Sequence, residues 1–166
     1  MLSGRSTKLA GSFVGLDKRY RTDVDLTART TTGDPEGEIV ERPAAPDADE
    51  LARRLEGLRG DIELPVPAAS AVKIGGERAY RLHRRGVAVE MPLRRSRVDA
   101  LDVIAYRDGV ATLDLRVSSG TYVRAIAEAL GGHCRTLRRT EIGPFRVEDA
   151  DEERIIPADV ALALLS

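Results

Sequence analysis

One short segment of this 166-residue chain switches from strand-like to helix-like hydrophobic periodicity, and this switch constrains the fold more than any other feature. Apolar and polar residues alternate from Leu113 to Val117, as in a strand with one buried face. Apolar residues then recur at helical spacing from Ala125 to Leu130, and Gly120 lies between the two patterns. The chain must therefore place a strand, a sharp turn and a helix in immediate succession, which predicts a fold that mixes strands and helices.

Two side chains with binding chemistry stand at the head of this predicted helix. The turn reads Ser-Ser-Gly-Thr-Tyr-Val-Arg over residues 118–124, which leaves Tyr122 and Arg124 where they can face a ligand. An aromatic face beside a guanidinium suits a nucleobase, because the ring stacks on the base while the guanidinium binds a carboxylate or a phosphate. The ordinary alternative for Arg124 is an exposed helix arginine without a ligand.

The rest of the chain predicts further short strands and helices. In order, they are a helix over 6–14, a strand over 18–26, a polar turn over 27–37, a short strand at 39–40, a helix from a capping box at Asp47 to Gly60, an extended segment over 64–68, a short strand over 70–73, a basic helix over 77–85, strands over 97–106 and 110–117, a helix from 122 to the glycines at 131 and 132, strands over 137–142 and 145–147, and a last helix from Pro157. Asp108-Gly109 is a strong hairpin signal between two of the strands. The expected fold class is α+β, a mostly antiparallel mixed sheet flanked by helices.

Composition excludes several kinds of site. The single cysteine, Cys134, excludes an intramolecular disulfide, and the two histidines offer no metal-ligand spacing. No signal peptide and no apolar run of transmembrane length is present in the sequence. We therefore expect a soluble, cytoplasmic protein with no metal site and no membrane partner.

The net charge of −1 conceals a strong segregation of charge along the chain. Residues 68–97 hold eight basic and two acidic side chains, whereas residues 34–63 hold ten acidic and four basic ones. Residues 148–159 add six acids against one arginine. This pattern predicts one basic and one acidic surface. The excess of arginine over lysine suits bidentate phosphate contacts, although a GC-rich coding sequence gives the same excess.

Five motifs occur in a fixed order: Lys-Arg-Tyr-Arg at 18–21, Thr-x-Thr-x-Asp-x-x-Gly at 30–37, Ser-Ala-x-Lys-x-x-Gly-x-Arg-x-Tyr at 70–80, Ser-x-Gly-Thr-Tyr-Val-Arg at 118–124 and Leu-Arg-Arg-Thr-x-x-Gly-x-Phe at 137–145. In this order and at these distances, the set resembles the bacterial tRNA pseudouridine synthase B family, from about Thr7 to about Ala150. The resemblance implies the pseudouridine synthase catalytic-domain fold. It also implies isomerisation of the T-loop uridine-55 of tRNA to pseudouridine, without a cofactor.

The resemblance also implies a division of the chain. Residues 1–150 correspond to part of the catalytic domain, with 65–86 as a loop that contacts the T-arm of tRNA, and residues 151–166 form a C-terminal helix. The family's nucleophilic aspartate lies in a Gly-His-x-Gly-Thr-Leu-Asp-Pro-x-Ala-x-Gly loop, which belongs upstream of Gly4. No aspartate of this sequence stands in that context, and Asp34 matches the family's different Thr-x-Thr-x-Asp-x-x-Gly turn. We expect that loop and the family's C-terminal RNA-binding domain to be absent.

Four residues receive site roles from the resemblance. Tyr20 matches the tyrosine that stacks on the target uracil, and its alternative is a strand tyrosine packed on the sheet. Arg124 matches the arginine that orients the nucleophilic aspartate. Without that partner, we expect Arg124 to be an unpaired cation, free to bind a phosphate. Tyr122 matches a second active-site tyrosine, and Leu137 matches a leucine near the base, with plain core packing as its alternative.

Seven basic residues are candidates for contact with the RNA backbone. Lys18 and Arg19 are placed beside Tyr20, where a solvated strand end is the alternative. The other five fall in the tRNA-contacting loop, where an ordinary basic helix face is the alternative; they are Lys73, Arg78, Arg81, Arg84 and Arg85. Phosphate contacts of this kind add affinity and salt dependence rather than base recognition.

Three explanations fit a synthase-like chain without its nucleophile. It is the back part of an ordinary synthase whose start was misplaced, half of a split enzyme completed by an N-terminal chain, or a catalytically silent tRNA binder. The first two predict isomerase activity once the missing segment is supplied, and a complete enzyme is expected to be monomeric. The third predicts salt-sensitive binding of tRNA without a product. A purely structural protein is at odds with several base-handling motifs in one chain.

Overall fold

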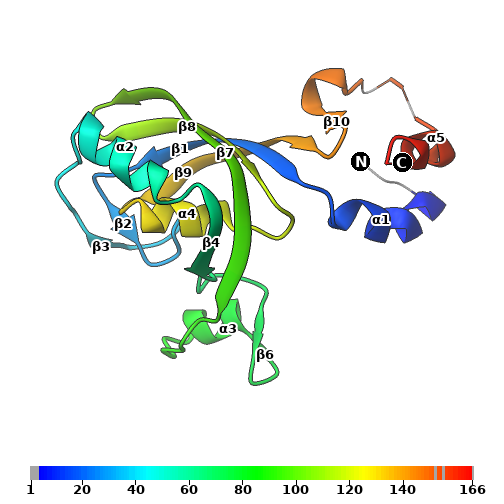
Figure 1. Ribbon diagram of the computed structural model, residues 1–166. Coiled ribbons are helices and arrows are strands. Elements are labelled where there is room, and N and C mark those ends of the chain that lie inside the picture. Colours follow the sequence, from blue (N-terminus) through cyan, green and yellow to red (C-terminus); the bar gives the residue numbers. More distant parts are fainter. Residues whose placement is uncertain (1–3, 152, 155, 166) are drawn as a thin grey trace.

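A computed structural model describes residues 4–151, 153–154 and 156–165 of the chain. Its centre is a six-stranded sheet in the order β10-β9-β1-β8-β7-β4, and every pairing in this described sheet is antiparallel. Helices accompany the sheet, so the expected α+β class is confirmed (Figure 1). The elements are β1 (Lys18–Asp25), β2 (Arg29–Thr30), β3 (Ile39–Glu41), β4 (Gly60–Pro65), β5 (Lys73–Ile74), β6 (Glu77–Arg78), β7 (Leu93–Arg107), β8 (Val110–Val117), β9 (His133–Ile142), β10 (Phe145–Arg146), α1 (Ala10–Val14, preceded by a 3-10 turn Gly4–Leu9), α2 (Ala48–Glu56), α3 (Ala79–Arg84), α4 (Val123–Ala129) and α5 (Ala158–Ala163), with a 3-10 turn at Val147–Asp149.

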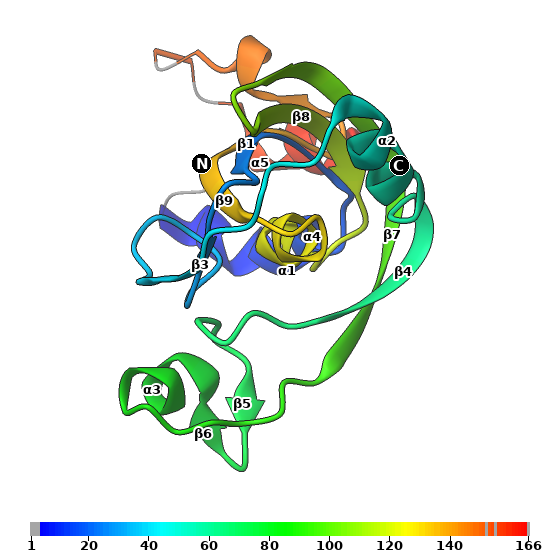
Figure 2. The same cartoon turned by 90° about the vertical axis from the view of Figure 1, so that its left-hand side faces the viewer.

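The core forms on the face of the sheet toward which α4 packs. The sheet curves around α4 (Figure 2), and the apolar residues of β8 that alternate in the sequence, Leu113, Leu115 and Val117, are fully buried. Helix α2 adds Leu51 and Leu55 to the same core, and Leu58, just after the end of the helix, is buried with them. The alternation predicted for β8 is therefore confirmed. One face of the strand is covered by the core, and the other carries the charged side chains of Asp114 and Arg116.

The Asp108-Gly109 turn joins β7 and β8 as predicted. Both residues have positive φ, 50° and 76°, which is the conformation of a type I′ hairpin turn. A Cβ on Gly109 would lie 2.4 Å from a methyl carbon of Thr27, so the turn also packs closely on the loop that follows β1. This hairpin fixes the register between β8 and the longest strand of the sheet.

Several predicted boundaries are wrong. Helix α2 ends at Glu56 with Gly57 as its C-cap, and Gly60, with φ of 77°, instead opens β4. The strand expected over 70–73 lies at 73–74, and it pairs with Glu77–Arg78, so the basic helix begins only at Ala79. Periodicity gave no sign of strand β2, whose two residues are too few to show alternation.

An arm projects from the sheet where β4 ends and β7 begins. It consists of the β5–β6 hairpin and α3, and both views show it standing apart from the core (Figures 1 and 2). The ring of Phe13 in α1 lies 5.7 Å from the ring of Phe145 in β10. In the part of the chain that the structure describes, no helix is long and apolar enough to cross a membrane.

Candidate functional site

The turn between β8 and α4 places Tyr122 and Arg124. Gly120 has φ of 79°, a conformation that favours glycine, and Thr121 donates its hydroxyl to the Ser118 carbonyl over 2.9 Å. Tyr122 occupies the N-cap position with extended backbone, so Arg124 is the second residue of the helix. Both side chains are half-buried, as expected for residues at the edge of a site.

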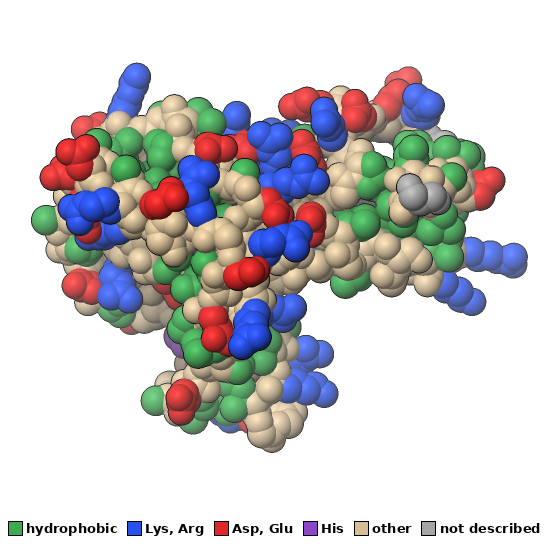
Figure 3. All heavy atoms as spheres, viewed as in Figure 1, with side chains coloured by type: hydrophobic (Ala, Val, Ile, Leu, Met, Phe, Trp, Pro, Cys, Tyr) green, Lys and Arg blue, Asp and Glu red, His purple; other side chains and the backbone are tan. Residues whose placement is uncertain are grey.

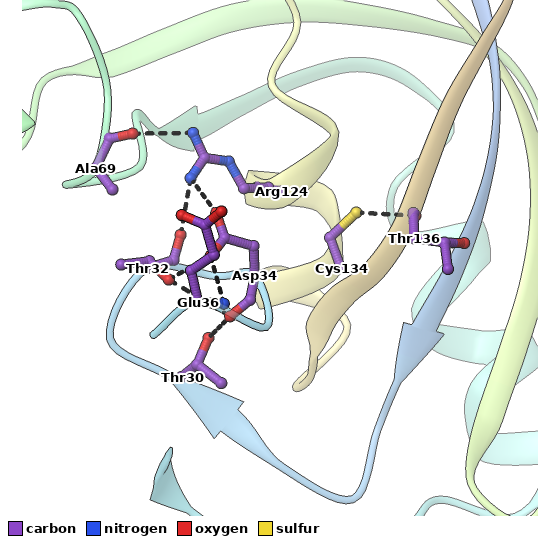
Figure 4. Close-up of polar contacts among 8 residues, drawn as sticks. All are labelled: Thr30, Thr32, Asp34, Glu36, Ala69, Arg124, Cys134 and Thr136. Carbon is purple, nitrogen blue, oxygen red and sulfur yellow. Dashed lines mark hydrogen bonds and ion pairs between the residues drawn. The ribbon is translucent and has the colours of Figure 1, made fainter. Parts of the chain in front are cut away.

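Arg124 is held by three acceptors from two distant segments (Figure 4). Its Nη1 donates to the Asp34 carboxylate over 2.7 Å and to the Thr32 carbonyl over 3.1 Å, and its Nη2 donates to the Ala69 carbonyl over 2.9 Å. The expectation that Arg124 is unpaired is therefore wrong. The sequence places Asp34 in a turn, but it does not show that this turn folds against α4, 90 residues further along the chain.

The Asp34 carboxylate is fixed from its other side by its own turn. Its Oδ1 accepts the Thr32 hydroxyl over 2.6 Å and the Glu36 amide over 3.2 Å, and its backbone carbonyl accepts the Thr30 hydroxyl over 2.7 Å. The side chains of Asp34 and Arg124 are 26% and 23% exposed. Both carboxylate oxygens are occupied, so Asp34 acts here as a rigid anchor for the guanidinium.

A second carboxylate, that of Glu128, lies one helical turn beyond Arg124. It packs against Gly33, where an added Cβ would lie 2.2 Å from its Oε1. Burial raises the pKa of the Glu128 carboxyl and the charge of Asp34 acts in the same direction, whereas Arg124 and Arg29 lower it in part. Sequence reasoning missed Glu128, although its position four residues after Arg124 places both on one helix face.

Tyr20 and Leu137 lie on one face of neighbouring strands. Tyr20 is opposite Leu115 on β8, and Thr22 is opposite Leu137 on β9, so Leu137 is a diagonal neighbour of Tyr20 on the covered face. Tyr20 is partly buried against the core. Leu137 is 49% exposed, so its alternative reading as plain core is wrong.

The two basic residues before Tyr20 are already engaged. The Lys18 Nζ donates to the carbonyls of Val14 and Leu16 over 2.7 and 2.6 Å and to the Ser119 hydroxyl over 3.2 Å. Burial, and next the charge of Arg139, lowers the pKa of Lys18. Arg19 points to the other face of the sheet and pairs with two carboxylates there, those of Asp114 at 2.6 Å and Glu141 at 3.3 Å. Their contact with RNA stays a prediction, and Lys18 is not the solvated strand end of the alternative reading.

The arm carries five exposed basic side chains along its length, namely Lys73, Arg78, Arg81, Arg84 and Arg85. Figure 3 shows Lys and Arg side chains gathered on one side of the arm. Arg81 and Arg84 lie 5.9 and 5.8 Å from the ring centre of Tyr80, and Arg85 pairs with Glu77 through two bonds of 2.8 and 2.9 Å. The structure thus brings these residues together on one protrusion, away from Arg124.

The site offers a cation, two carboxylates and aromatic faces. Within residues 4–151, 153–154 and 156–165, no group of three or more His, Cys, Asp or Glu side chains is arranged to hold a metal ion. The donors that the guanidinium still has free can bind an additional carboxylate or a phosphate, and the half-buried tyrosines can contact a base.

Comparison with known proteins identifies close relatives. Residues 1–123 match the family described as TruB family pseudouridylate synthase (N terminal domain). A tRNA pseudouridine synthase B from Mycobacterium sp. (strain KMS) is 43% identical over 158 residues, and one from Nocardia farcinica (strain IFM 10152) is 44% identical over 158 residues. One from Pseudomonas aeruginosa (strain UCBPP-PA14) is 39% identical over 154 residues. These matches cover 88%, 88% and 89% of this chain and 53%, 52% and 51% of the relatives, so the chain spans about half the length of the curated relatives it matches.

Solved structures share the fold at lower identity. A chain in a structure titled "Crystal Structure of a Cbf5-Nop10-Gar1 Complex" superposes with a TM-score of 0.60 at 21% identity and covers 86% of this chain and 35% of that one. A chain of an H/ACA RNP bound to a substrate RNA containing 2'-deoxyuridine has a TM-score of 0.57 at 17% identity, covering 90% and 35%. The likeness supports the architecture of the sheet and of the helices that accompany it.

Proposed function

The chain belongs to the TruB family of pseudouridylate synthases, and on this premise we propose that it is part of an isomerase that converts the T-loop uridine-55 of tRNA to pseudouridine. The observation that carries the proposal is the group formed by Tyr122 and Arg124 at the start of α4, with Tyr20 and Leu137 on neighbouring strands. This group combines aromatic faces, an apolar side chain and a fixed cation.

The chemistry explains why such a group is needed. Pseudouridine formation breaks the N-glycosidic bond, turns the uracil and rejoins it through C5, and a carboxylate nucleophile can carry the covalent step. The target base must first leave its stack, which is favoured by an aromatic platform. Tyr20 would stack on the uracil, while Tyr122 and Leu137 would confine it.

Arg124 can bind a nucleophilic carboxylate while it stays paired with Asp34. A guanidinium has five N–H donors, and the three bonds to Asp34, Thr32 and Ala69 use both hydrogens of Nη1 and one of Nη2. The Nε hydrogen and one Nη2 hydrogen remain as donors for another carboxylate. Asp34 would then orient Arg124, and Arg124 would orient the nucleophilic aspartate and keep it ionised.

The T-arm of tRNA is the proposed partner. The basic residues of the arm would contact its phosphates, which gives binding that is strong at low salt and weak at high salt. The enzyme family supports a place in the cytoplasm.

Two alternatives are also proposals: a catalytically silent tRNA binder, and half of a split enzyme that an N-terminal chain completes. These candidates agree on RNA binding and differ in whether an added nucleophile segment produces pseudouridine.

Binding of a fluorescent T-arm hairpin over a range of salt concentrations tests the proposal. We expect affinity to fall steeply with salt, and Tyr20→Ala to weaken binding by about tenfold, since stacking of a base on an aromatic ring contributes roughly 1–3 kcal/mol. Tyr20→Phe keeps the ring and is the matched control. An affinity that is indifferent to salt and to Tyr20→Ala would contradict the proposed function.

A further inference from the structure

Arg94, at the start of β7, packs against the turn that leads into α4. Its guanidinium carbon lies 5.9 Å from the ring centre of Tyr122. A Cβ added to Gly120 would lie 2.1 Å from its Nη2, 2.8 Å from its Cζ and 3.2 Å from its Nε. The guanidinium therefore fills the space that the missing side chain of Gly120 leaves open.

Among the described residues, Arg94 has no acidic partner and no side-chain hydrogen bond, unlike the other arginines of the same strand end. Arg95 pairs with Glu63 at 3.6 Å, and Arg97 pairs with Asp99 at 2.7 Å and Asp17 at 3.4 Å. The position of Arg94 is set by packing on a ring and a glycine turn. Its charge and its donors thus remain available to an anion from outside.

The position of Arg94 connects the two regions that the proposed substrate would touch. It is the second residue after the arm returns to the sheet, opposite Leu64 on β4. With Leu64, Thr121 and Tyr122 it lines a small hollow beside α4, and Tyr122 is two residues before Arg124. Figure 2 shows the arm joined to the sheet through β4 and β7, with α4 beside them. An RNA that contacts both the arm and the head of α4 would run past this point.

We propose that Arg94 binds a phosphate of the RNA backbone at this position, with the Gly120 turn and the Tyr122 ring holding its guanidinium ready for the contact. A planar guanidinium with neighbouring donors binds phosphate oxygens in pairs, and a guanidinium that is already ordered loses less entropy on binding. The same contact would seat the nucleotide beside Tyr122. This inference rests on the proposed function, because it takes RNA as the ligand.

The test measures the affinity of a T-arm hairpin against salt for the full chain and for four variants, Arg94→Ala, Arg94→Gln, Arg94→Lys and Arg95→Ala. Arg94→Gln keeps an apolar stem and a planar amide beside Tyr122 but removes the charge. Arg95→Ala is the matched control, since it removes a neighbouring arginine that is 89% exposed and pairs with Glu63. Thermal melts of each variant verify that it is folded.

We expect Arg94→Ala and Arg94→Gln to weaken binding about threefold to tenfold and to reduce the slope of log affinity against log salt by roughly 0.7–0.9, the value for one phosphate contact. Arg94→Lys should keep most of that slope, and Arg95→Ala should match the wild type. If Arg94→Gln has the affinity and salt slope of the wild type, Arg94 has only a packing role and the inference is overturned. It is also overturned if Arg94→Ala and Arg94→Gln both have the same affinity and salt slope as Arg95→Ala. Failure of the proposed function is a separate result, in which the wild-type chain itself shows no salt-dependent binding.

Discussion

At the scale of single residues, the site depends on one arginine shared by two segments that are far apart in the sequence. Arg124 bonds to Thr32 and Asp34 in the turn between β2 and β3, and to Ala69 in the segment that leads from β4 into the arm. Each acceptor is a polar group removed from water to some degree, so the loss of the guanidinium leaves all three without their donor. The same side chain therefore contributes to stability as well as to the proposed chemistry.

Replacement of Arg124 by alanine should lower the free energy of unfolding by about 1–3 kcal/mol, the cost of leaving a buried hydrogen-bond acceptor without its donor. Arg124→Lys should restore only part of the lost stability, because a compact ammonium cannot reach all three acceptors that the wider, planar guanidinium contacts. Urea denaturation measures both. Arg138→Ala, at an exposed position of β9, is the control, and an Arg124→Ala variant as stable as this control would contradict the assignment.

Glu128 should make stability depend on pH. Burial raises the pKa of its carboxyl in the folded state, so the folded protein keeps this proton to a higher pH than the unfolded chain does. Below the ordinary glutamate range both states are protonated, and the residue has no effect. As pH rises through the ordinary pKa to the raised one, ionisation favours the unfolded state and stability falls.

Glu128→Gln removes this ionisation while it keeps the shape of the side chain. The variant should match the wild type near pH 3 and become the more stable of the two as pH rises toward neutrality, which denaturation midpoints across the pH range will measure. A stability difference that stays constant with pH, or that favours the wild type at neutral pH, would refute this account of Glu128.

At the scale of elements, local signals in the sequence define the ends of helices and hairpins. Asp47 caps α2 by accepting the Glu50 amide over 2.8 Å, as the sequence predicts. Asp47→Ala should cost about 1 kcal/mol, a typical value for the loss of an N-cap. Asp49→Ala, inside the first turn of the same helix, should cost about half as much or less by thermal denaturation. Equal losses for the two variants would show that the cap contributes nothing specific.

The sequence predicts the elements better than their contacts, for a physical reason. The alternation in β8, the Asp108-Gly109 turn and the position of Arg124 at the head of a helix all depend on residues close in sequence. The bond between Arg124 and Asp34 depends on how the chain returns after 90 residues, which no local pattern encodes. No local pattern encodes the contact of Glu128 with Gly33 or that of Arg94 with Gly120 either. Each contact is possible because the glycine has no side chain, and a missing side chain leaves no periodic pattern in the sequence.

At the scale of the whole molecule, charge and shape act together, because the basic stretch of the sequence becomes a protruding arm. Changing both Arg81 and Arg84 to glutamine should reduce the salt slope of T-arm binding by about 1.4–1.8, since neither is paired with an acid among the described residues. Arg53→Gln on α2, where the arginine pairs with Glu50, is the control. Salt slopes that do not differ between the arm variant and this control would remove the arm from the RNA interface.

The central claim, that this chain is the RNA-handling part of a pseudouridine synthase, is tested most directly by pseudouridine mapping in a T-arm hairpin. The chain would be supplied with a segment that carries the family's Gly-His-x-Gly-Thr-Leu-Asp-Pro loop, and with the same segment bearing asparagine in place of its aspartate. The account predicts pseudouridine at the T-loop uridine with the aspartate segment only, and none from the chain alone. Product from the chain alone, or no product from an aspartate-bearing complex that binds the hairpin, would contradict it.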